Sequence, residues 1–125
     1  MESSVRQIAD VTLIRIDGRV DHATAKAFEE VIKPHLDDTG GVPLPKILLD
    51  VGGLSFMTSA GLRVLMIAAK ACAAQGRDLA VAALQPAIAE IFKISRFDLV
   101  LTIYPTVEEG LSRLSSEAAA LWEAG

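Results

Sequence analysis

Strand-like and helix-like patterns of apolar residues alternate along this 125-residue chain. Apolar residues that alternate, or that form short continuous runs, predict strands, whereas apolar residues three and four positions apart predict helices. The predicted strands are residues 5–9, 11–18, 47–49, 79–83 and 99–104. The predicted helices are residues 23–33, 60–75, 86–95 and 107–121; Pro34 should end or disturb the first, and Gly76 should end the second.

The alternation of strands and helices predicts an α/β fold in a single domain spanning residues 1–125. Helices between successive strands require parallel pairing, and the strand expected at residues 5–9 adds an edge. We therefore expect a mixed, mostly parallel sheet of four to five strands, flanked by about four helices. The loop-like residues 37–45 are too few for a domain linker and predict a surface connection.

The most informative stretch is residues 47–62. The apolar run Ile47–Leu49 predicts a buried strand that Asp50 ends, and Gly52-Gly53 predicts a sharp turn. Thr58 and Ser59 are good N-cap residues for the helix that follows. The predicted loop 50–59 would lie outside the carboxyl ends of the strands, where the working sites of α/β sheets are found.

Composition narrows the class of protein. The net charge of −4 and the absence of a basic stripe argue against a nucleic-acid partner. No apolar run reaches the roughly 20 residues of a membrane span, and the N-terminus does not resemble a signal peptide. The single cysteine, Cys72, suits a reducing compartment, so we expect a cytoplasmic protein.

The sequence offers no positive sign of an enzyme or of a cofactor. It has no phosphate-binding glycine loop, and Ser59 is not in a nucleophile elbow. His22 and His35 lie on either side of the first helix and form no metal pair with a cysteine. These absences favour a binding module that needs no metal or other cofactor.

Two blocks of sequence, Gly18–Ala25 and Leu54–Leu62, resemble the STAS domain of bacterial anti-sigma factor antagonists. Residues 91–97 are similar to the family's third-helix region. The resemblance covers roughly residues 11 to 114, and the second block is its most specific part.

The resemblance implies a STAS fold and a partner-switching function. In that family the unphosphorylated protein sequesters an anti-sigma factor that is also a serine kinase with a GHKL-type ATP site. Phosphorylation of one serine releases the kinase, and a metal-dependent phosphatase restores the unmodified form. By alignment on Gly61-Leu62, the phosphorylated serine is Ser59.

This chain departs from the family motif at two positions. Thr58 replaces the usual aspartate, which makes Thr58 the second choice for the phosphorylated residue. Ala60 stands where a second hydroxyl is common.

The predicted partner-binding residues surround Ser59. Arg63, four positions later, is expected either to pair with a phosphate or an acidic partner or to be a solvated surface residue. Asp21 is expected either to contact the partner or to cap the first helix. The second helix carries two apolar stripes, one for the sheet and one for a partner, a neighbouring helix or a weak homodimer. The complete predicted set is Asp21, Met57, Thr58, Ser59, Gly61, Arg63, Val64 and Ile67.

Two other functions remain open from the sequence. One is a STAS module of a transporter or of a multiprotein signalling complex that is never phosphorylated. The other is a small nucleotide-binding, ligand-binding or enzymatic α/β domain, against which the missing phosphate loop argues.

Overall fold

The computed structural model describes residues 1–37, 44–77 and 79–124. Five strands form one sheet in the order β1-β2-β3-β4-β5. The β1–β2 pair is antiparallel and the other three pairs are parallel, which confirms the predicted mixed, mostly parallel sheet. The elements are β1 (Glu2–Ile8), β2 (Val11–Val20), α1 (Ala25–Leu36), β3 (Lys46–Met57), α2 (Ser59–Ala74), β4 (Leu79–Ala82), α3 (Pro86–Ile94), the 3₁₀ helix η1 (Phe97–Leu99), β5 (Thr102–Tyr104), α4 (Val107–Leu114) and α5 (Ser116–Ala124).

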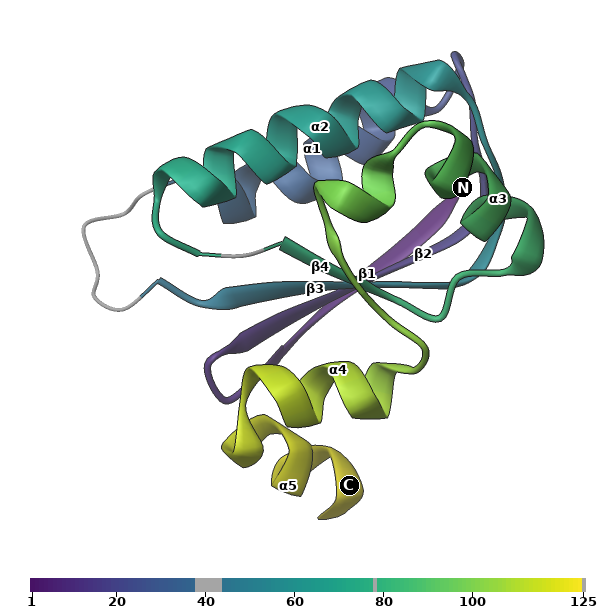
Figure 1. The fold of residues 1–125 in the computed structure, drawn as a ribbon. Helices are drawn as coiled ribbons and strands as arrows, with labels where there is room; N and C mark the ends of the chain where they lie inside the picture. Colours follow the sequence, from purple (N-terminus) through teal and green to yellow (C-terminus); the bar gives the residue numbers. More distant parts are fainter. Residues whose placement is uncertain (38–43, 78, 125) are drawn as a thin grey trace.

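Helices cover both faces of the sheet (Figure 1). On one face α1, α2 and α3 bury a large apolar core that includes Ile14, Leu49 and Phe28. On the other face α4 and α5 cover a smaller core that includes Leu48 and Leu111. Because successive side chains of a strand point to opposite faces, the continuous apolar run of β3 is explained by burial on both sides.

The predicted end of the central strand was wrong. Strand β3 continues through Gly52 and Gly53 to Met57, so most of the predicted loop 50–59 is strand. Neither glycine has a positive φ, so backbone freedom does not explain this pair. A Cβ on Gly53 would lie 1.6 Å from Oδ1 of Asp17 on the neighbouring strand, so glycine is required here for a close side-chain approach.

The first helix differs from its prediction at both ends. It begins at Ala25 and contains Pro34, which lies in its last turn. The carbonyl oxygens of the last two helical residues are satisfied from outside: Arg77 Nη2 donates to His35 O at 2.6 Å, and Gln75 Nε2 donates to Leu36 O. These donors give the helix end hydrogen bonds that a short, proline-containing turn lacks on its own.

The C-terminal third also differs in detail. The strand predicted at 99–104 begins only at Thr102, because residue 99 ends η1 and residues 100–101 form a turn, and the predicted last helix is two helices. Ser115 has extended backbone angles between α4 and α5, and its Oγ accepts a hydrogen bond from the Ala118 N–H at 3.2 Å. This local cap starts a new helix where apolar spacing alone predicted continuation. Of the predicted loop 37–45, residues 38–43 lie outside the described residues.

Candidate functional site

The candidate site lies where β2 and β3 end and α2 begins. Val20 and Met57 are the last paired residues of these parallel strands. The Thr58 N–H donates to the Val20 carbonyl at 2.9 Å, which fixes the start of α2 against the end of β2. The hydroxyls of Thr58 and Ser59 therefore lie at the carboxyl edge of the sheet, as the sequence predicted.

The two adjacent hydroxyls are in different environments. Ser59 is the first residue of α2 and is exposed. Thr58 is at the N-cap position, but its side chain makes no capping hydrogen bond. Its Oγ1 is buried and has no hydrogen-bond partner among the described residues. Ser59 is the accessible hydroxyl of the pair, at a helix N-terminus that favours negative charge.

A groove runs between α1 and α2 and reaches Ser59. Near Ser59 it carries the cationic side chains of Lys26 and Arg63, with Glu29 farther along α1. Beyond Ile67 it becomes an apolar hollow of about 360 Å³. The residues lining the Ser59 end are His22, Ala25, Lys26, Glu29, Ser59, Ala60, Arg63, Val64 and Ile67. The apolar end is lined mainly by Ile32, Leu36, Val64, Ile67, Ala68 and Ala71, together with the charged residues Glu29, Lys33 and Asp37.

The second apolar stripe of α2, formed by Val64, Ile67, Ala68 and Ala71, is thus partly covered by α1. Val64 is 8% exposed and Ala68 is 1% exposed, whereas Ile67 is 52% exposed. Only Ile67 presents a large apolar side chain of this stripe to solvent. Of the three expectations for the stripe, burial under a neighbouring helix accounts for Val64 and Ala68.

Asp21 organises the turn between β2 and α1. Its Oδ1 accepts hydrogen bonds from the backbone N–H groups of Ala23 at 3.0 Å and Thr24 at 3.2 Å. The Thr24 hydroxyl lies 3.1 Å from the same oxygen. These hydrogen bonds, led by that of the Thr24 side chain, lower the pKa of Asp21. Asp21 therefore caps the turn before the helix rather than the helix itself, and its side chain is half-buried.

Three predicted partner-binding residues lie beneath the site surface. Met57 is 2% exposed, and Val64 and Gly61 are buried as well. A Cβ on Gly61 would lie 2.8 Å from both Met57 Cγ and Val20 Cγ1. The first turn of α2 packs directly on the strand ends, so these residues position Ser59 and Arg63, the exposed members of the predicted set near the helix start.

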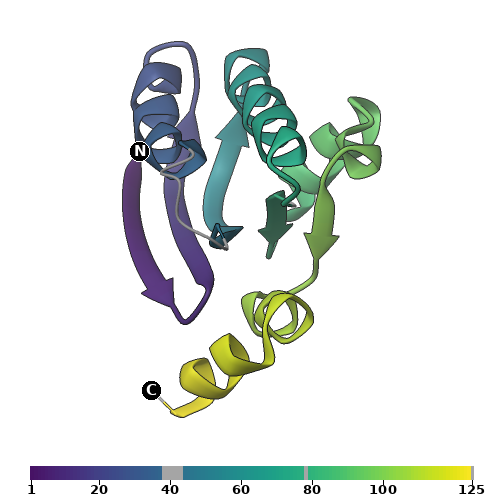
Figure 2. The same ribbon diagram turned by 90° about the vertical axis from the view of Figure 1, so that its left-hand side faces the viewer.

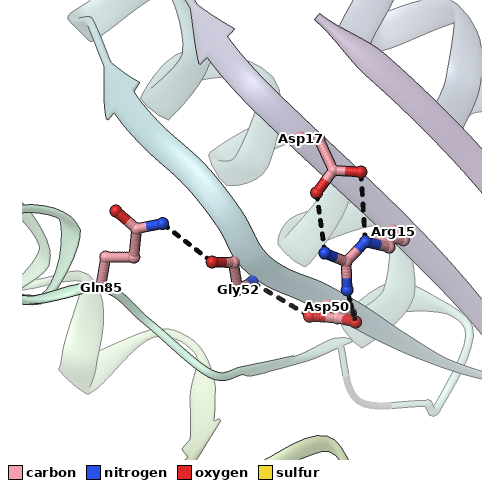
Figure 3. A network of polar contacts seen from close by, with 5 residues as sticks. All are labelled: Arg15, Asp17, Asp50, Gly52 and Gln85. Atoms are coloured by element: carbon pink, nitrogen blue, oxygen red, sulfur yellow. Dashed lines mark hydrogen bonds and ion pairs between the residues drawn. The ribbon is translucent and has the colours of Figure 1, made fainter.

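A polar network that the sequence analysis missed joins β2 and β3 behind the site (Figure 3). Arg15 donates to Asp17 through Nε at 3.1 Å and Nη2 at 3.0 Å, and to Asp50 Oδ2 through Nη1 at 2.9 Å. Asp50 Oδ1 accepts from the Gly52 N–H at 3.0 Å, so Asp50 also bonds to the backbone of its own strand. Gln85 Nε2 donates to the Gly52 carbonyl at 2.8 Å. An arginine and an aspartate two residues apart on a strand share a face, which was the available signal.

The described residues contain no group of three or more histidine, cysteine, aspartate or glutamate side chains arranged to hold a metal ion. Among the helices of the described chain, none is both long enough and apolar enough to cross a membrane.

Comparison with known proteins gives a consistent result. The family model of the STAS domain matches residues 2–110. BtrV of Bordetella bronchiseptica, a candidate anti-sigma factor antagonist, is 30% identical over 120 residues, covering 96% of this chain and 92% of its own.

Two solved structures share the fold. An anti-sigma factor antagonist from Mycobacterium paratuberculosis matches with a TM-score of 0.80 and 23% identity, covering 90% of this chain and 92% of its own. The Bacillus cell fate determinant SpoIIAA, in its phosphorylated form, matches with a TM-score of 0.69 and 20% identity, covering 91% of this chain and all of its own. With these matches and the five-stranded fold, the chain belongs to the STAS domain family.

Proposed function

We propose that this protein is an anti-sigma factor antagonist, a binding module without enzymatic activity of its own. In its unmodified form it sequesters an anti-sigma factor that is also a serine kinase with a GHKL-type ATP site. We place this interaction in the cytoplasm. Phosphorylation of Ser59 releases the kinase, and a metal-dependent phosphatase reverses the modification. The 30% identical Bordetella relative carries the name of an anti-sigma factor antagonist, which supports this assignment.

The observation that carries the proposal is the position of Ser59. Its side chain is exposed at the start of α2, at the open end of the groove between α1 and α2. A phosphate there adds about −1.5 to −2 charge and three acceptor oxygens. The helix N-terminus stabilises such a charge, so the modification leaves the fold intact.

Phosphorylation also changes what a partner meets. Arg63, one turn after Ser59, and Lys26 across the groove are placed to neutralise the phosphate. A partner that uses these cations for its own acidic groups then loses them and gains a like charge, which costs several kcal/mol at an interface. Exposed Ile67, farther along the groove, supplies an apolar contact for the unphosphorylated complex.

The decisive experiment uses the GHKL-type anti-sigma kinases of the same organism, expressed one by one. Calorimetry would compare their binding to the unmodified protein, to Ser59→Ala and to Ser59→Asp, and radiolabelled ATP would report phosphate transfer. We expect one kinase to bind the first two proteins tightly, to bind Ser59→Asp about 100-fold more weakly, and to phosphorylate only the unmodified protein. Equal binding of all three, without phosphate transfer, would instead indicate a STAS module of a signalling complex that is never phosphorylated.

A further inference from the structure

Strand β1 leaves one long edge of the sheet unpaired. It has seven residues in continuous register with β2, and six of the seven are exposed. The opposite edge strand, β5, has only three residues. In Figure 2 no helix of the described chain lies beyond the outer edge of β1. Natural edges are usually protected by shortness, proline, charged side chains or a bulge; β1 is long, has no proline or bulge, and carries two charged residues, Glu2 and Arg6.

The direction of the unpaired backbone groups follows from the turn after β1. Ile8 and Val11 are directly paired across the two-residue turn 9–10, and such a closing pair is hydrogen-bonded. Hydrogen-bonded and non-hydrogen-bonded pairs alternate along an antiparallel ladder. The N–H and C=O groups of Ser3, Val5 and Gln7 therefore point away from β2, toward solvent.

The charges along this edge are self-complementary. Glu2 and Arg6 lie on the same face of the strand, two residues to either side of Ser4. An antiparallel copy of the strand centred on Ser4 places Glu2 opposite Arg6 twice. Centring on Arg6 would oppose two arginines, and centring on Ser3 or Val5 would leave both charges without a directly opposite partner.

We propose that β1 binds β1 of a second copy of this chain, antiparallel and centred on Ser4. Ser3 and Val5 then form the two hydrogen-bonded pairs, and Glu2 and Arg6 form two cross-strand ion pairs. The Arg6 guanidinium lies 5.5 Å from the ring centroid of Trp122 on α5, which restricts its position on the face that it shares with Glu2. The two sheets become one ten-stranded sheet across the two-fold axis.

This interface leaves the candidate site free. In Figure 2, β2 lies between β1 and α2, and Ser59 is the first residue of α2, so the new contact does not cover it. The two-fold axis is perpendicular to the joined sheet and places the α1–α3 layers of both copies on the same side. The dimer would present two Ser59 sites together, whether or not the proposed switch operates.

Disulfide cross-linking tests the register. Two Ser4→Cys side chains would face each other on the axis as a non-hydrogen-bonded pair, with Cα atoms about 4.5 Å apart, within disulfide range. The matched variant Ser3→Cys places its thiols two residues out of register, and Cys72 is buried in both proteins. After oxidation with copper–phenanthroline we expect a cross-linked dimer from Ser4→Cys alone. Equal cross-linking of both variants, or of neither, would overturn the proposed register.

Charge reversal tests the interface without relying on oxidation. By sedimentation equilibrium, Glu2→Arg and Arg6→Glu should each raise the dimer Kd about tenfold or more, and the double variant should restore it. Glu30→Arg on the exposed side of α1 controls for net charge.

Val5→Pro should leave a folded monomer, because the N–H it removes faces outward. A monomeric unmodified protein at millimolar concentration, or a double variant as weak as the single ones, would overturn the proposal.

Discussion

Residue type alone cannot decide which of the adjacent residues Thr58 and Ser59 is the phosphorylated one. Both are hydroxyl residues at the start of a helix, and the sequence left Thr58 as a second choice for phosphorylation. The structure separates them by burial, since the Oγ1 of Thr58 is enclosed and Ser59 is exposed. A kinase needs an accessible hydroxyl, so this difference favours Ser59.

Replacing Thr58 by valine should therefore be harmless. The substitution keeps the side-chain shape and removes a buried hydroxyl that has no partner among the described residues. Stability in urea should stay the same or rise by up to about 1 kcal/mol. Phosphorylation by the kinase partner should persist in Thr58→Val. A loss of more than about 1 kcal/mol would mean that the hydroxyl is hydrogen-bonded in solution.

Asp21 should make the stability of the turn before α1 depend on pH. Its hydrogen bonds lower its pKa below the unfolded value of about 3.9, so its contribution is complete above that pH and is lost as pH falls through the folded pKa. Asp21→Ala should be less stable than the unmodified protein at pH 7. The gap between the two melting temperatures should narrow as pH falls below about 4. A gap of constant size between pH 7 and pH 2.5 would contradict this role.

At the scale of elements, periodicity predicted the number and order of strands well but not where β3 ends. Every predicted strand and helix has a counterpart, because apolar spacing reflects burial directly. Gly52-Gly53 predicted a turn because a glycine pair usually marks one, but the pair lies inside β3. Here Gly53 instead makes room for a side chain of β2, a contact between residues far apart in sequence that no local pattern reports.

The reason for glycine at position 53 can be tested by a mutant cycle. Gly53→Ala should displace Asp17, break its contacts with Arg15 and cost about 1–3 kcal/mol of unfolding free energy. In an Asp17→Ala background the same substitution should cost much less, because the obstructing carboxylate is absent. Gly52→Ala is the matched control, since its Cβ meets Asp50 Oδ1 at a milder 3.2 Å. Equal costs in both backgrounds would show that Asp17 is not the reason.

At the scale of the whole molecule, the two faces of the sheet have different roles. The α1–α2 face carries the groove and Ser59, while α4 and α5 cover the other face. Arg77 connects the end of α1 to the chain just before β3. Its guanidinium donates to the carbonyls of His35 on α1, at 2.6 Å, and Pro45 before β3, at 2.7 Å. This role could not be predicted from residue type, because an arginine after a helix is usually a solvated residue.

Removing Arg77 should loosen α1 from the rest of the fold. Arg77→Met keeps much of the side-chain volume but leaves these carbonyls and Gln75 Oε1 without their donor, at a cost of about 2–4 kcal/mol. Arg113→Met, at an exposed position on α4, should change stability by less than about 0.5 kcal/mol. Urea unfolding of both variants gives the comparison, and similar effects would argue against the bridging role.

The most direct test of the proposed switch is mass spectrometry of the protein purified from its own cells with phosphatase inhibitors present. Trypsin cleavage after Lys46 and Arg63 releases one peptide, residues 47–63, that contains Ser55, Thr58 and Ser59. We expect one phosphate on this peptide, assigned to Ser59 by fragmentation and absent from Ser59→Ala. We also expect a kinase to co-purify with the unphosphorylated form alone. An unphosphorylated Ser59 under all growth conditions, or a kinase bound equally to both forms, would contradict the account.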